Sequence, residues 1–127
     1  MKFTIALTDL ETLHKAAGLS KLKKTDVFTL FACAGRVFTE FKGDVAGIEE
    51  LVLEDGAVTV PAKNFVDLIK TYKGTRLLNI EAGPDRLKVQ NFSMPILGYN
   101  PSPTPPAQFR VFPAVDVGPG PQGATRS

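Results

Sequence analysis

The chain has 127 residues and a formal net charge of +2, with 43% hydrophobic and 22% charged residues, which is typical of a soluble globular protein with one domain. No apolar run is long enough to span a bilayer, and the first ten residues reach charge too early for a signal peptide, so we expect a cytoplasmic protein with no membrane partner. The single cysteine, Cys33, excludes a disulfide within the chain.

The first segment, "KFTIALTDLETLHKAAG" at residues 2–18, predicts a strand at 3–5 followed by a helix. Leu10, Leu13 and Ala17 recur at the spacing that gathers side chains on one helical face. His14, the only histidine, lies beside this apolar stripe. We predict that it is packed or half-exposed, and that it is neither a general base nor a metal ligand.

Two strands that turn at Ala34-Gly35 are expected next, over residues 26–35 and 36–43, followed by a third strand over 48–54. Cys33 lies mid-strand between two alanines, which predicts a buried, inert thiol. Five carboxylates follow along the third strand and its flanking turns, and we interpret them as a solvated face and not a metal site. They are Asp44, Glu49, Glu50, Glu54 and Asp55.

The segment "EDGAVTVPAKNFVDLIKTYKG", residues 54–74, repeats the change from strand to helix. Asp55-Gly56 is a hairpin-type turn signal, residues 58–60 are β-branched, and Pro61 is suited to a helix start. Gly74 is placed to end the helix. The predicted buried face comprises Ala62, Phe65, Val66, Ile69 and Tyr72, and the polar face Lys63, Asn64, Asp67, Lys70 and Thr71. Strands over 75–83 and 86–92, with a turn at 83–85, and a third strand over 93–99 are expected to follow.

A shift of 55 positions superimposes the two units. Phe3 falls on Val58, Leu13 on Leu68 and Lys15 on Lys70. We therefore predict an α+β fold made of duplicated β-α-β-β-β units, with two helices packed on one side of an antiparallel sheet and with Leu13, Leu68 and Ile69 buried. The alternative is that strand and helix alternate twice by chance.

The composition changes near residue 100. The segment "NPSPTPPAQFRVFPAVDVGPGPQGATRS" is rich in proline and glycine and carries little charge. Proline neither continues a sheet interior nor builds a helix. We therefore expect a domain over 1–100 and an extended Pro/Gly-rich tail over 101–127.

Candidate catalytic groups are lacking in the sequence. One histidine and one cysteine cannot form a zinc cluster, and the glycines do not form a phosphate-binding loop between a strand and a helix. We therefore predict a protein that is not an enzyme and needs no metal or other cofactor.

Lysines cluster on and after both predicted helices. These residues are Lys15, Lys21, Lys23, Lys24, Lys63, Lys70 and Lys73. If both helices pack on one side of the sheet, their outer faces form one weakly basic surface. Lysine is a mobile point charge, so such a surface suits the phosphates of duplex DNA without reading the bases. The alternative is a pair of ordinary solubilising helix faces.

The segment 54–74 resembles the bacterial DNA polymerase III beta sliding clamp family, in which an acidic-Gly turn also leads to a V-T-V-P-A-K junction. The resemblance covers about residues 1–100 and is closest to the first of the three clamp domains. It implies a DNA-clamp fold, with helices on the inner wall of a ring facing the duplex backbone and sheets on the outer wall joining subunit edges. In that family three domains form a protomer and two protomers close the ring, so one domain implies six copies. The family's peptide cleft is formed by its later domains, and no residue here is assigned to it.

The tail segment "QFRVF", residues 108–112, resembles the short peptides that dock into bacterial clamps. In that interpretation Val111 and Phe112 fill an apolar pocket, Gln108 hydrogen-bonds at its rim and Phe109 lies between them. The alternative is that the tail folds back, with Phe109 and Phe112 covering an edge of its own domain.

The sequence therefore supports two functional hypotheses. The first is a homo-oligomeric module that tethers DNA, in replication or repair, with a DNA polymerase as a possible partner. The second is a protein-interaction module that keeps the clamp fold without the ring and binds a full-length clamp or its own neighbour through Gln108 to Phe112.

Overall fold

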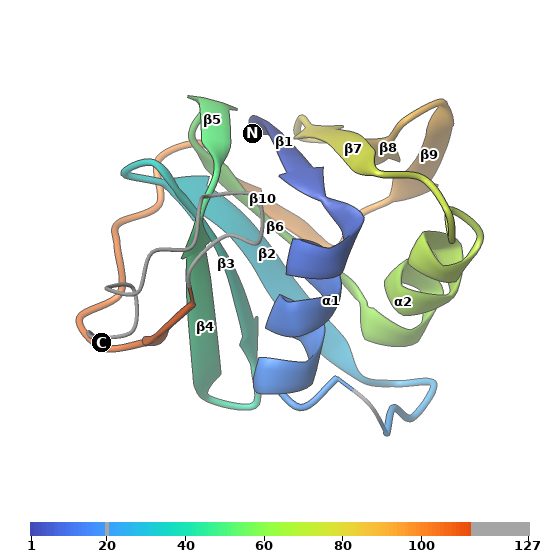
Figure 1. Ribbon diagram of the computed structural model, residues 1–127, viewed down its shortest axis with the longest axis horizontal. Coiled ribbons are helices and arrows are strands. Elements are labelled where there is room, and N and C mark those ends of the chain that lie inside the picture. The colour runs from blue at the N-terminus through green and yellow to red at the C-terminus, as the bar shows by residue number, and fades with distance from the viewer. Residues whose placement is uncertain (20, 113–127) are drawn as a thin grey trace.

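The computed structural model describes residues 1–19 and 21–112, which form two helices and eleven strands (Figure 1). The first repeat contains β1 (Lys2–Ala6), α1 (Leu7–Ala16), β2 (Val27–Cys33), β3 (Arg36–Phe41), β4 (Asp44–Glu49) and β5 (Leu51–Glu54). The second repeat contains β6 (Gly56–Pro61), α2 (Ala62–Lys70), β7 (Leu77–Ala82), β8 (Arg86–Val89), β9 (Phe92–Pro95) and β10 (Gly98–Asn100). A further strand, β11 (Arg110–Phe112), follows in the predicted tail.

The strands divide between two sheets. One has the order β5-β1-β7-β8-β9, and the other has the order β10-β6-β2-β3-β4-β11. Every described pair of neighbouring strands is antiparallel except β11, which runs parallel to β4. The predicted α+β fold is therefore confirmed, with the strands in two sheets and one parallel pair at an edge.

The duplication is also confirmed, because the two repeats make equivalent pairings. In the first repeat β2, β3 and β4 are consecutive neighbours, as are β7, β8 and β9 in the second. The first strand of each repeat pairs with the other repeat, β1 with β7 and β6 with β2. Each helix begins with a matching hydrogen bond, from Leu7 N–H to the Arg76 carbonyl and from Ala62 N–H to the Asp26 carbonyl, at 3.0 and 2.9 Å.

The prediction of one continuous third strand in each repeat is wrong. Residues 48–54 contain the end of β4 and all of β5, and residues 93–99 contain most of β9 and part of β10. In each repeat the two pieces belong to different sheets. The break comes at Glu50, whose N–H bonds to the Gly35 carbonyl, and at Leu97, whose N–H bonds to the Thr59 carbonyl. These bonds lie where the chain passes from one sheet to the other.

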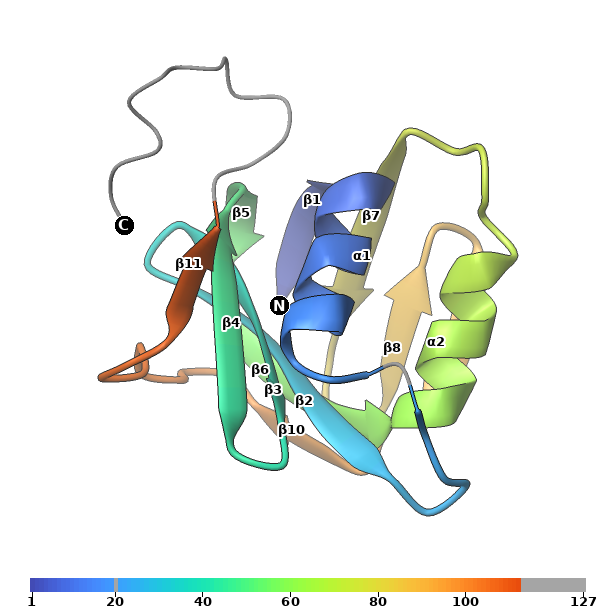
Figure 2. The same ribbon diagram turned by 60° about the horizontal axis from the view of Figure 1, so that its bottom comes forward.

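One hydrophobic core joins both sheets and both helices. Leu13 and Ile69 are buried as predicted, with 0% and 3% of their surface exposed. Leu68 is only partly buried and packs against the margin of the core, so the prediction of its full burial is wrong. Helix α1 packs on β1, β3 and β4, whereas α2 packs mainly on β6 and β2. Figure 2 shows the two helices with β8 visible in the gap between them, and the His14 ring of α1 lies 5.6 Å from the Phe65 ring of α2 between centroids.

Candidate nucleic-acid interface

A groove of about 280 Å³ lies between α1 and α2. It is lined by Glu11, His14, Lys15, Leu19, Val66, Ile69 and Lys70. Lys15 and Lys70 occupy equivalent positions in the two repeats, and the structure brings both to this groove. Their convergence follows from the duplication, because each helix presents the same polar face.

His14 lies at this groove, where only 7% of its surface is exposed. Its ring makes edge contacts with Phe28 and Phe65, with ring centroids 6.0 and 5.6 Å away. Nε2 is buried and has no hydrogen-bond partner. Burial lowers the pKa of His14 to about 4, because the charged imidazolium would lose its hydration. His14 is therefore neutral at pH 7, and it is packed, which is one of the two placements that the sequence predicted.

The other predicted DNA-facing lysines are all exposed but lie apart from the groove. Lys63 pairs with Asp67 one turn along α2, with Nζ 3.5 Å from Oδ2. Lys73 lines a separate hollow beyond the end of α2. Lys21, Lys23 and Lys24 belong to the loop that joins α1 to β2.

Two charged residues near these lysines were missed by the sequence analysis. Glu11 lines both the helix groove and the hollow at Lys73, so a carboxylate interrupts the basic surface. Its spacing of four residues from Lys15 on one helix was the signal for it. Lys42 lies in the turn between β3 and β4, and its Nζ is 3.7 Å from Oδ1 of Asp26 in the α1–β2 loop. Only the fold reveals that this lysine adjoins the loop lysines.

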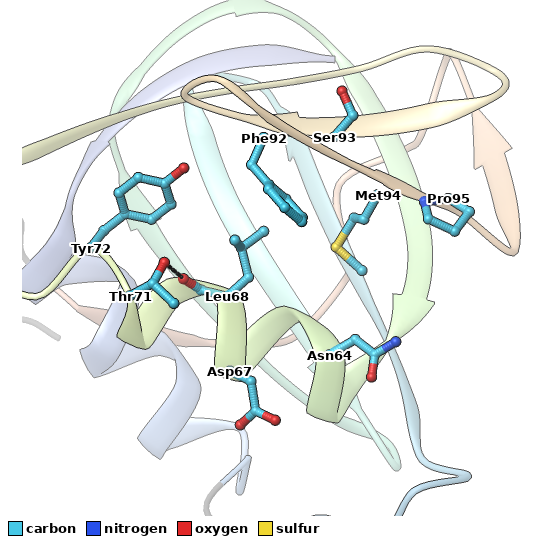
Figure 3. Close-up of a pocket in the computed structure, with 9 residues that line it drawn as sticks. All are labelled: Asn64, Asp67, Leu68, Thr71, Tyr72, Phe92, Ser93, Met94 and Pro95. Carbon is cyan, nitrogen blue, oxygen red and sulfur yellow. Dashed lines mark hydrogen bonds between the residues drawn. The ribbon is translucent and has the colours of Figure 1, made fainter.

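A second groove, of about 620 Å³, lies between α2 and β9 (Figure 3). It is lined by Asn64, Asp67, Leu68, Thr71, Tyr72, Phe92, Ser93, Met94 and Pro95. Its inner walls are apolar, and Phe92 is 51% exposed. Tyr72 OH donates to the Val89 carbonyl at 3.1 Å and closes one end. The sequence analysis did not predict this groove.

The first repeat explains why this groove exists. Strand pairing places Ala46 opposite Thr39 and Phe92 opposite Val89, which are equivalent positions in the two repeats. Ala46 is fully buried and α1 packs closely on β4. A phenylalanine cannot occupy that space under a helix at the same separation. We infer that Phe92 keeps α2 away from β9 and leaves the groove open.

The predicted partner-binding tail lies against the other edge strand. Residues 110–112 pair with residues 46–48 of β4. Phe109 is half-buried, and its ring meets Phe38 edge-on at 4.9 Å between centroids. Gln108 is exposed and Val111 is 50% exposed, while the Phe112 side chain lies outside the described residues. Residues 113–127 of the predicted tail also lie outside the described part of the chain.

The remaining candidate groups do not form a site. Cys33 is buried, and burial together with the Asp55 carboxylate raises the pKa of its thiol, which favours the unreactive protonated form. Within residues 1–19 and 21–112, no three His, Cys, Asp or Glu side chains are grouped to hold a metal ion. In the same part of the chain, no helix has the length and apolar character needed to cross a membrane.

Neither a protein-family model nor a curated protein matches the sequence. Solved structures do match. The Helicobacter pylori beta clamp in complex with 3,4-difluorobenzamide gives a TM-score of 0.63 at 20% identity, over 76% of this chain and 30% of the clamp. The same clamp bound to a DNA ligase peptide gives a TM-score of 0.59 at 20% identity, over 76% of this chain and 31% of the clamp. A third match is the Pseudomonas aeruginosa DnaN sliding clamp (DNA polymerase III subunit beta) bound to griselimycin. It gives a TM-score of 0.60 at 22% identity, over 95% of this chain and 34% of the clamp.

This chain thus spans about a third of the length of the clamps that it matches. The matched architecture consists of the duplicated repeats with their two helices and two sheets. The chain has the fold of a single domain of a bacterial DNA polymerase III beta clamp.

Proposed function

We propose that this protein is a non-catalytic, clamp-like module that holds duplex DNA through the outer faces of α1 and α2, as a homo-oligomer in replication or repair. The observation that supports the proposal is the convergence of Lys15 and Lys70, one from each repeat, on one groove between the helices. Flexible ammonium groups on a helical surface bind phosphates without selecting a base sequence. In this role the protein acts in the cytoplasm, with a DNA polymerase as a partner.

Duplex binding in the variant Lys15→Gln, Lys63→Gln, Lys70→Gln tests this role. We expect weaker binding to every duplex sequence, and a salt dependence whose slope falls by up to about 0.9 for each phosphate that the variant no longer neutralises. Lys63 should contribute least, because Asp67 already neutralises it.

The matched control removes three equal charges from strands β1 and β8, with Lys2→Gln, Arg86→Gln and Lys88→Gln. These three side chains are exposed and lie away from both helices. The helix variant must bind DNA more weakly than this control. Equal binding by the two variants, or no duplex binding by the parent at low salt, would exclude the helix faces as a DNA surface.

The second proposal is a protein-interaction module that uses residues 108–112. It is supported by the exposure of Gln108 and Val111, since both side chains can be reached by another protein. The Helicobacter pylori clamp binds a DNA ligase peptide, which gives a suitable full-length clamp as the probe. Changing Val111 and Phe112 to Ala should abolish binding to that clamp and leave the melting temperature nearly unchanged. A large loss of stability would instead show that the segment belongs to its own domain.

A further inference from the structure

One edge of the five-stranded sheet is open at β5. Strand β1 pairs with one edge of β5, and no strand of the described residues pairs with the other. Leu51 and Leu53 are 63% and 57% exposed, with the half-buried Val52 between them. An open edge with exposed apolar side chains can accept a strand from another chain and promote aggregation, and proteins commonly cover such edges.

Strand β11 brings the chain close to this edge. It runs parallel to β4, with residues 110–112 opposite residues 46–48. The chain passes through Glu50 from β4 into β5, which lies beyond the end of β4 (Figure 1). In both ribbon views β11 and β1 lie on opposite sides of β5 (Figure 2). Strand β11 therefore points toward the open edge and ends three residues short of the position opposite Leu51.

We propose that residues 113–117 of this chain cover the open edge of β5 by continuing the register of β11. Carried three residues further, that register sets Val115 opposite Leu51 and Val117 opposite Leu53. The occupant of the edge is thus the chain's own tail. The proposal depends neither on DNA binding nor on the binding of another protein by residues 108–112.

The sequence of this segment, "PAVDV", is suited to that place. Val115 and Val117 are β-branched, and residues two apart on a strand share one face, here the face of Leu51 and Leu53. Each valine would form an apolar cross-strand pair with one leucine. Asp116 would project from the opposite face of the outermost strand, where a charge discourages the addition of a further strand.

Both ends of the segment also fit the length of β5. Pro113 would lie opposite Glu49, at the end of β4, and proline is tolerated on an edge strand. Gly118 and Pro119 end the alternation of valines, and the same register sets Gly118 opposite Glu54, the last residue of β5. The segment that can form a strand is therefore as long as the edge that it would cover.

Disulfide trapping in the full chain tests the register. In a Cys33→Ala background, Val117→Cys is combined with Leu53→Cys or, as the matched control, with Lys88→Cys. Lys88 is exposed on β8, three strands away from β5 in the same sheet. Neighbouring strands lie about 4.8 Å apart, within the Cα separation that a disulfide spans.

On mild oxidation, we expect a disulfide within the chain from the Leu53→Cys pair and free thiols in the Lys88→Cys pair. Thiol alkylation followed by mass spectrometry of the monomer distinguishes the two results. Equal closure of both pairs, closure of neither pair, or disulfides formed only between chains would overturn the proposal.

Amide hydrogen exchange tests the cover without a new covalent bond. Val115→Ser with Val117→Ser should speed the exchange of β5 amides about ten-fold, because the segment loses its apolar contacts with the β5 leucines. The control, Ala124→Ser with Thr125→Ser, changes the tail beyond the segment and should exchange like the parent. Equal β5 rates in the parent and the valine variant, or the same acceleration in the control, would show that residues 113–117 do not cover β5.

Discussion

The two repeats share one topology but differ in how closely the helix covers the third strand. In the first repeat α1 packs on β3 and β4, and Ala46 is fully buried between them. In the second repeat Phe92 holds the equivalent place and is half-exposed, and a groove of about 620 Å³ separates α2 from β9. The layer under the helix is thus closed core where the residue is Ala46 and accessible surface where it is Phe92.

The same comparison applies to the inner faces of the helices. The shift of 55 positions places His14 on Ile69, and both side chains are buried. The first repeat therefore keeps a titratable ring where the second has an aliphatic side chain. Burial among Phe28 and Phe65 holds that ring in its neutral form.

The largest expected loss of stability comes from shortening Leu13, and it should exceed the loss from shortening Leu68, which occupies the equivalent position. Leu13→Ala should cost about 2–5 kcal/mol of unfolding free energy, because the side chain is fully buried. Leu68→Ala should cost about 1 kcal/mol, because Leu68 lies at the margin of the core and borders the groove. Urea denaturation of both variants measures the difference. Equal losses of unfolding free energy would mean that α1 and α2 pack equally closely on the third strands of their repeats, contrary to the difference described above.

The pH dependence of stability tests the difference between His14 and Ile69. The folded pKa of about 4 lies below the ordinary value of 6.5, so the unfolded chain takes up the proton first as the pH falls. Stability should therefore decrease from pH 7 toward pH 4, by about 3 kcal/mol from this residue. His14→Leu should remove that part of the decrease. The parent and His14→Leu have the same carboxylates, so the carboxylates contribute equally to both. If the two proteins lose stability in parallel between pH 7 and pH 4, the lowered pKa of His14 is refuted.

The exchange of residues 46 and 92 tests the cause of the groove directly. Ala46→Phe should cost about 1–3 kcal/mol, because it forces a ring under α1. Phe92→Ala should change stability by less than about 1 kcal/mol, since that ring is half-exposed. Thermal unfolding gives both values. If Phe92→Ala proves the more damaging change, then Phe92 is core and does not separate α2 from β9.

Much of the fold follows from local patterns in the sequence. The β-branched run before Pro61 and the three-and-four spacing after it correctly predict β6 and α2. The turns at Ala34-Gly35 and at residues 83–85 were predicted from their residue types, and Ala34 and Gly35 both have positive φ, at 53° and 74°. Lys15 and Lys70, which hold equivalent positions in the two repeats, line one groove.

The missed features all depend on packing between distant segments. Nothing local distinguishes Glu50 from its neighbours, yet the chain changes sheet there. The sequence allowed the tail to fold back on an edge of its own domain, as it does, but not the choice of β4 as that edge. Room for the tail at β4 comes from Gly47, because a Cβ there would lie 2.7 Å from the Phe38 ring and 3.0 Å from Phe109.

The exchange of first strands between the repeats has a consequence for how such a domain can arise. Strand β1 completes the sheet of the second repeat, and β6 completes the sheet of the first. Only Asp55 joins β5 to β6. A single ancestral repeat of this kind would have an incomplete sheet until a second copy donated its first strand. The domain therefore has the topology of two strand-exchanged repeats joined in one chain.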